Sequence, residues 1–230
     1  MRKIVGGAVL LILAVSLGGC AVTNAKSAPE ASFQFTSAKK RLVVIEPDVQ
    51  LGELTASGIF EPRADWTSSA KQLIVSNVGS ILDGRGIEVI PVDNLTERRQ
   101  IQLAKLHGVV GGAIVRHLYG NEKLPNKGSA LDWTLGPGTV DFRDSYGADY
   151  ALFLYVRDSY STSGRVALMI GAALLGVGVP GGQQSAFASL VDLRSGDIVW
   201  FNTLHSGTGD LRSAEPAQKT VASLIGDMPL

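Results

Sequence analysis

The hydrophobic and polar positions of the chain switch between strand-like and helix-like patterns. Residues 42–45 form a continuous apolar run ending before Pro47, a pattern typical of a strand covered on both faces. Residues 49–63 contain glycine and proline and predict turns and loops. Residues 66–82 predict a helix capped by Asp65, with apolar side chains at three- and four-residue spacing: Trp66, Ala70, Leu73, Ile74, Val78, Ile81 and Leu82.

A second strand and helix follow. Residues 87–92 predict a strand, and Pro91 places it near an edge of the sheet because proline cannot donate to a strand ladder. The next helix is expected to begin near Asn94 or Thr96 and to end near Leu118. Its three internal glycines indicate either close packing on the sheet or a break in the helix. The expected buried face consists of Ile101, Ala104, Leu106, Val110, Ile114 and Leu118.

The second half of the chain completes a sheet. Residues 119–147 form a long connection that should lie against the body, with a short helix at about 139–146. Residues 148–158 predict a strong strand, and 185–204 predict a hairpin with a glycine-containing turn. Residues 213–227 predict a closing helix. This order predicts a single mixed α/β domain over 41–230, with helices packed on a sheet of about five strands.

One apolar segment, residues 165–182, interrupts this order as an insertion. A helix over 166–179 would be about 21 Å long and too short to span a membrane. It is either buried on its own sheet or exposed for self-association or membrane contact. The residues expected to make that contact are Val166, Leu168, Met169, Ile170, Leu174, Leu175 and Val177.

The N-terminus carries a processing signal. Three residues with two basic side chains precede an apolar stretch at 4–15, and Leu17, Gly18, Gly19 and Cys20 follow. These four residues resemble a bacterial lipobox, which implies a signal peptide over 1–19 and a lipid anchor on Cys20. Residues 20–40 are expected to be a flexible tether. A transmembrane anchor is the alternative, but the apolar stretch is short for one. Ala21, in place of aspartate, implies the outer membrane by the same resemblance.

Composition excludes several classes of function. The 230 residues include 21 basic and 21 acidic side chains, and loss of residues 1–19 would remove two of the basic ones. This balance argues against a nucleic-acid partner. Cys20 is the only cysteine, so no disulfide within the chain and no cysteine-based zinc site is expected.

The remaining candidate chemistry is weak. His107, His117 and His205 lack metal-ligand spacing, and no Gly-x-Ser-x-Gly motif is present. Residues 176–181 match Gly-x-Gly-x-x-Gly but precede a predicted strand, whereas a dinucleotide site needs a helix there. We therefore expect no cofactor, no metal and no catalytic residue.

Two segments carry a family resemblance: Gly-Ala-Asp-Tyr-Ala-Leu-Phe-Leu-Tyr-Val at 147–156 and Ala-Ser-Leu-Val-Asp-Leu-Arg-Ser-Gly-Asp-Ile-Val-Trp at 188–200. With the lipobox, they resemble a group of bacterial envelope lipoproteins. The group includes curli-secretion-channel lipoproteins, activators of penicillin-binding proteins and uncharacterised lipoproteins similar to the N-terminal domain of the Tol propeller protein. The resemblance implies an anticodon-binding-like fold and action through protein contacts. Ser195, where threonine is usual, and the insertion at 165–182 depart from the group.

The sequence thus predicts an outer-membrane-anchored periplasmic lipoprotein that acts without catalysis as an assembly or accessory factor. Its partner is an unidentified envelope protein or a second copy of the chain. A subunit of an oligomeric export channel and an envelope hydrolase are the alternatives.

Overall fold

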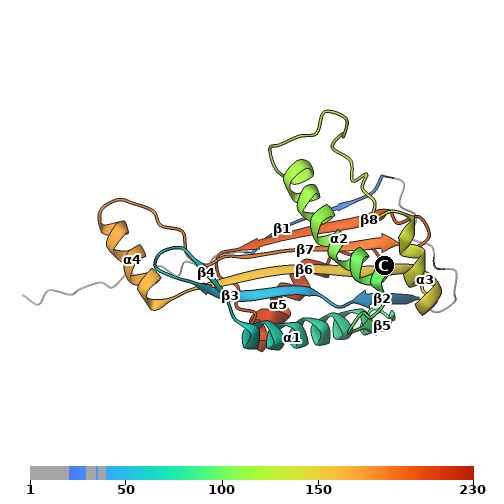
Figure 1. The fold of residues 1–230 in the computed structure, drawn as a ribbon, viewed down its shortest axis with the longest axis horizontal. Coiled ribbons are helices and arrows are strands. Elements are labelled where there is room, and N and C mark those ends of the chain that lie inside the picture. The colour runs from blue at the N-terminus through green and yellow to red at the C-terminus, as the bar shows by residue number, and fades with distance from the viewer. Residues whose placement is uncertain (1–20, 30–34, 36–39) are drawn as a thin grey trace, which may run out of the picture.

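The structure is a computed structural model that describes residues 21–29, 35 and 40–230. It confirms a single mixed α/β domain, but the sheet has eight strands and not five. Figure 1 shows their arrangement. The strands are β1 (Val22–Ser27), β2 (Arg41–Ile45), β3 (Asp48–Leu54), β4 (Phe60–Pro62), β5 (Glu88–Val92), β6 (Tyr150–Ser161), β7 (Gln184–Asp192) and β8 (Ile198–Ser206). The helices are α1 (Ala64–Asp83), α2 (Arg98–Ile114), α3 (Val140–Tyr146), α4 (Ser163–Leu174) and α5 (Ala214–Ile225), with a π-helical turn at Val115–Tyr119 and a 3-10 turn at Pro137–Thr139.

The sheet is organised around β6, its longest strand. The main strand order is β1-β8-β7-β6-β2-β5, in which β6, β7 and β8 are antiparallel neighbours and β2 is parallel to both β5 and β6. Strand β3 also pairs with β6 in parallel, beyond the end of β2, and β4 pairs with β3. The prediction of loops over residues 49–63 is therefore wrong, because β6 is long enough to pair with two strands in succession.

The prediction of a flexible tether over residues 20–40 is wrong for β1. Residues Val22–Ser27 pair antiparallel with β8, in a register that matches Val22 with His205 and Ser27 with Trp200. The side chains of this strand are mostly exposed and carry no hydrophobic pattern. Its order comes from main-chain hydrogen bonds to β8, which composition does not reveal. The predicted lipobox, including Cys20, lies outside the described residues.

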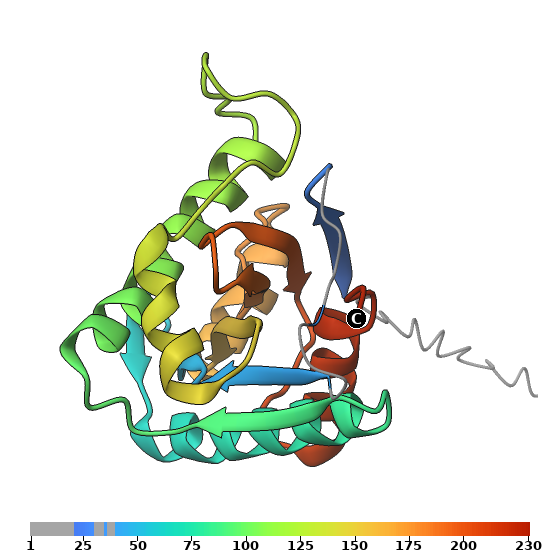
Figure 2. The same ribbon diagram turned by 90° about the vertical axis from the view of Figure 1, so that its right-hand side faces the viewer.

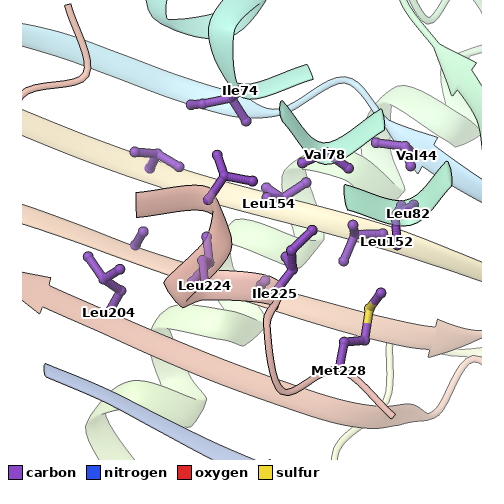
Figure 3. Packing of buried hydrophobic residues seen from close by; sticks show 14 of the residues in the cluster. Val44, Ile74, Val78, Leu82, Leu152, Leu154, Leu204, Leu224, Ile225 and Met228 are labelled. Atoms are coloured by element: carbon purple, nitrogen blue, oxygen red, sulfur yellow. The ribbon is translucent and has the colours of Figure 1, made fainter. Parts of the chain in front are cut away.

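Helices cover both faces of the sheet. Helices α1 and α5 pack on one face, and α2 and α3 pack on the other, as Figures 1 and 2 show. Figure 3 shows the first core, in which Ile74, Val78 and Leu82 of α1 meet Leu224 and Ile225 of α5 over the sheet. Strand β2 contributes alternate residues to both cores, which confirms that it is covered on both faces.

The helix at 66–82 is confirmed in α1, whose buried residues Ala70, Ile74, Val78 and Leu82 belong to the predicted apolar face. Its N-cap is Arg63 and not Asp65. Asp65 lies in the first turn, where the Arg63 side chain donates to its carboxylate. That hydrogen bond lowers the pKa of Asp65.

Helix α2 is present, but it is rotated relative to the predicted face. It buries Gln100, Leu103, His107, Gly111 and Ile114, whereas Leu106 is exposed. The reason is Gly111: a Cβ built there would lie 2.1 Å from Cε2 of Phe187, so the helix packs its glycine directly on the sheet. The close-packing interpretation of the glycines is confirmed at this position.

The connection at 119–147 lies against the body, as predicted. Leu131, Leu135 and Phe142 are buried, and Thr134 pairs with Asp197 in the β7–β8 turn. The short helix is α3. The hairpin of β7 and β8 and the closing helix α5 also agree with the prediction.

Candidate interaction surface

Residues 163–182, hereafter the apolar lobe, consist of α4 and the return loop that leads into β7. The lobe connects β6 to β7 and stands off one end of the sheet (Figure 1). Leu174 is 84% exposed and Leu175 is 82% exposed. The interpretation of this segment as a helix buried on its own sheet is therefore wrong.

Helix α4 is capped at both ends by residues adjacent to it in the sequence. At the N-terminus, the Thr162 hydroxyl accepts a hydrogen bond from the amide of Arg165 at 3.3 Å. At the C-terminus, Gly176 adopts a φ of 75°. The amides of Gly176 and Val177 then donate to the carbonyls of Ala173 and Ala172 at 3.0 and 2.9 Å. This is a Schellman motif, which satisfies carbonyls that the helix would otherwise leave unpaired.

The base of the lobe is polar and fastened to the sheet. Arg165 is 8% exposed and donates to the carbonyl oxygen of Pro180 from Nε at 3.1 Å and from Nη2 at 2.6 Å. The amide of Gly182 donates to the hydroxyl of Ser161 at 3.0 Å. These bonds join the first turn of α4, the end of the return loop and the end of β6. The lobe therefore has a fixed root.

The outer surface of the lobe is entirely apolar. From residue 166 to residue 182, no side chain contains nitrogen or oxygen. The predicted contact residues are exposed except for Met169, which is half-buried at the root beside the Ser161 hydroxyl. The exposed ones are Val166, Leu168, Ile170, Leu174, Leu175 and Val177. An apolar surface of this kind usually marks an interaction site.

A buried polar cluster lies near the root of the lobe. The carboxylate of Asp158 accepts hydrogen bonds from the Tyr160 hydroxyl, from Gln184 Nε2 at 3.0 Å and from the Leu211 amide at 3.4 Å. Gln184 Oε1 in turn accepts from the hydroxyl of Thr220 at 3.0 Å. Burial raises the pKa of Asp158 to about 6. The cluster joins β6, β7 and α5, so its bonds are accounted for by the fold.

The histidines do not converge. His107 is buried, its Nε2 lies 2.8 Å from the hydroxyl of Ser189, and its ring stacks on Phe153. His117 bonds to the carbonyl of Glu122, and His205 is exposed on β8. Within the described part of the chain, no three histidine, cysteine or acidic side chains are grouped so that they could hold a metal ion.

The Gly-x-Gly-x-x-Gly match lies in the return loop of the lobe. A helix precedes it and β7 follows it, which is the reverse of the order that a dinucleotide site requires. Its first glycine, Gly176, closes α4.

Sequence reasoning missed two features of the site. One is the role of Arg165, whose position at the start of the apolar segment was a signal that a charged root was present. The other is that three apolar side chains of α2 and the turn after it are exposed: Leu106, Val109 and Val115. Their spacing of three and six residues was visible, but the glycines between them obscured which side of the helix faced the sheet.

Among the residues that the structure describes, no helix is both long and apolar enough to cross a bilayer. No protein-family model matches the chain, and no curated protein matches it significantly. The solved structures similar to it include two PelC dodecamers. A PelC dodecamer from Paraburkholderia phytofirmans has a TM-score of 0.41 and 14% identity, over 90% of this chain and 95% of that one. A variant of that dodecamer in another crystal form has a TM-score of 0.42 and 15% identity, over 89% and 96% of the two chains. Likeness at this level leaves the function to be argued from the chain's own geometry.

Proposed function

We propose that this chain is a lipid-anchored lipoprotein on the periplasmic face of the outer membrane that acts without catalysis, as an assembly or accessory factor. The observation that carries the proposal is the apolar lobe. It is an addition to a sheet that is complete without it, because β6 and β7 pair from Tyr150–Asp192 to Asp158–Gln184 in unbroken register. A short turn would connect these strands equally well.

An exposed apolar addition disfavours a purely structural role. Burying such a surface gains roughly 25 cal/mol for each Å² removed from water, and leaving it exposed forgoes that gain. The exposed lobe therefore indicates that something covers it in the envelope. Two buried titratable side chains, Asp158 and His107, are bonded within the fold, which supports action by contact rather than by chemistry.

Crosslinking in the native envelope tests this proposal. A photo-reactive amino acid at Leu174 should crosslink to the surface that covers the lobe, and one at Ser195 serves as the matched control. Ser195 is exposed in the β7–β8 turn, at the opposite end of the sheet. If position 174 gives no adduct with protein or lipid beyond that at position 195, the lobe has no occupant and the proposal fails.

A lobe-less variant completes the test. Residues 163–180 are replaced by Asn-Gly, which joins Thr162 to Gly181 and keeps the Ser161–Gly182 hydrogen bond. We expect the variant to retain its circular dichroism spectrum and its unfolding free energy. Unlike an unlabelled wild-type chain, it should not compete with the photo-reactive parent for the crosslinks made at position 174. A variant that does not fold would show that the lobe belongs to the core.

Lipidation of Cys20 is tested separately, by incorporation of labelled palmitate into the wild-type chain and its absence from Cys20→Ser. An unlabelled wild-type protein would contradict the anchor.

A subunit of an oligomeric export channel is the second candidate. The observation that favours it is that β1, a largely exposed strand, ends the main strand path opposite β5. Two terminal strands permit edge-to-edge contact between copies in a ring. Rings in electron micrographs together with dye leakage from vesicles would support this candidate, and a monomer that leaves vesicles sealed would exclude it.

A further inference from the structure

The first described strand and the apolar lobe belong to the same end of the sheet. Val22 of β1 is paired with His205, His205 with Ser185, and Ser185 with Arg157 of β6. These four residues form one row across four neighbouring strands. Beyond this row, β6 continues to Ser161 and then enters the lobe.

The direction of β1 places its first residue, Val22, at the end of the sheet that carries the lobe. Strand β1 is antiparallel to β8, β8 to β7, and β7 to β6, so β1 runs opposite to β6. Because β6 ends at the lobe, β1 begins at that end. The residue that the lipobox assigns to lipidation, Cys20, is only two positions before Val22.

Chain lengths limit how far the lipid and the lobe can be apart. Two residues reach about 7 Å at most, so a lipid on Cys20 attaches within that distance of Val22. Four strands at about 4.8 Å spacing place β6 about 14 Å from β1 across the sheet. From Arg157 to Ser161, β6 extends about 13 Å further toward the same end before the lobe starts. A bilayer that holds the lipid is therefore within reach of the lobe.

We propose that the apolar lobe is a second membrane contact, which inserts into the lipid–water interface of the leaflet that carries the lipid anchor. This inference rests on the proposed lipidation of Cys20. In this arrangement lipid covers the lobe, and protein partners contact the rest of the surface.

The chemistry of the lobe fits lipid better than a protein groove. Exposed apolar side chains at 166, 168, 170 and 174 lie at 0°, 200°, 40° and 80° around α4, at 100° for each residue, so they extend over more than half of the helix circumference. A protein groove has a fixed shape and covers one side of a helix, whereas lipid chains adapt to whichever part of the helix enters the interface. Protein interfaces are also anchored by tryptophan, tyrosine and arginine, none of which occurs in residues 166–182.

The C-terminal end of α4 suits the lipid–water interface. Hydrocarbon cannot bond to free carbonyl groups, and the Schellman motif satisfies those of Ala172 and Ala173 inside the lobe. The 12 residues of α4 span about 18 Å, which suits a helix lying in the interface rather than one crossing the bilayer. Together with the anchor, such a contact would fix the orientation of the domain, with the β7–β8 turn facing away from the membrane.

The test uses the full lipoprotein in vesicles of phosphatidylethanolamine and phosphatidylglycerol. Leu174→Cys is labelled with an environment-sensitive fluorophore, and Ser195→Cys is the control at the far end of the sheet. We expect lipid brominated near its headgroup to quench the probe at position 174 about twofold, as insertion to about 5–10 Å implies. Probe at position 195 should be quenched only by aqueous iodide.

The possible failures are distinguishable. Acylated Cys20 cannot be labelled, so each variant has one free thiol; labelling of the wild-type protein would overturn the anchor and this inference with it. An unlabelled wild type with position 174 open to iodide would overturn lobe insertion alone. A probe that brominated lipid does not quench, but that native outer membranes shield from iodide, would assign the lobe to a protein or to a second copy.

Discussion

Arg165 and Pro180 are joined by two hydrogen bonds, from Nε at 3.1 Å and from Nη2 at 2.6 Å to the same carbonyl oxygen. The contact closes the apolar lobe at its root, because one residue begins α4 and the other ends the return loop. It explains how a segment with so little contact with the core keeps a defined position.

Replacing Arg165 should loosen the lobe without unfolding the domain. Hydrogen bonds to charged groups contribute about 1.5–3 kcal/mol, so Arg165→Ala should lower the unfolding free energy by about that amount at most. The larger effect should be faster proteolysis within residues 175–181, measured by mass spectrometry. Arg165→Lys keeps the charge but loses the forked pair of donors, so its proteolysis rate should lie between those of the wild type and Arg165→Ala. Unchanged proteolysis in Arg165→Ala would show that the contact does not hold the loop.

Two neighbouring glycines of α2 should respond in opposite directions to alanine. A Cβ at Gly111 would meet the ring of Phe187, which cannot retreat because it stacks on Tyr155 and Phe201 with centroids 4.6 and 5.4 Å away. Gly111→Ala should therefore destabilise the protein by about 1–3 kcal/mol.

Gly112 is the matched control, since a Cβ there meets no atom within 4 Å. Gly112→Ala should stabilise the protein by up to about 1 kcal/mol, through helix propensity. Chemical denaturation of both variants measures the difference. Equal effects would mean that α2 does not pack on the sheet through Gly111.

Asp158 should make the protein less stable as the pH rises from 4 to 6. Burial raises its pKa to about 6, from an ordinary value of 3.8, so the folded state favours the protonated form. The stabilising contribution is complete below pH 3.8 and is lost as the pH passes 6. The difference of about two units between the pKa of Asp158 in the folded and the unfolded chain corresponds to about 3 kcal/mol of unfolding free energy.

Asp158→Asn tests this assignment, because its amide cannot ionise. The difference in unfolding free energy between wild type and variant should change by about 2.5 kcal/mol between pH 4 and pH 7. A difference independent of pH would contradict the titration of Asp158.

His107 should act in the opposite direction. Burial lowers its pKa to about 3, so the unfolded chain gains a proton below pH 6.5 while the folded chain stays neutral. The contribution of His107 to the unfolding free energy is fully present above pH 6.5. Below that pH it falls by about 1.4 kcal/mol for each pH unit, which amounts to a loss of about 2 kcal/mol at pH 5.

The two titrations overlap, so the histidine is best measured in the Asp158→Asn background. There, His107→Leu combined with Ser189→Ala removes the ring and the hydroxyl that bonds to it. The acid-induced loss between pH 6.5 and 5 should disappear. If it persists, another group is responsible.

The sequence alone determined those elements whose signal is local. The periodicity from Ala70 to Leu82 specified α1, and the glycine-containing turn before Ile198 specified the β7–β8 hairpin. The apolar segment was also recognised, because its lack of polar side chains is a property of the chain itself. Its helix, expected over 166–179, runs instead from Ser163 to Leu174, where the Schellman motif at Gly176 ends it.

Only the tertiary structure decided how these elements are used. A fully apolar segment has the same pattern whether it is buried or exposed, so only its position beyond the end of β6 showed that Leu174 lies at the surface. Strand β1 has no pattern of its own and owes its order to main-chain bonds with β8. Burial of His107 followed from the close approach that Gly111 permits. Each of these depends on contacts between residues distant in sequence, which no local pattern contains.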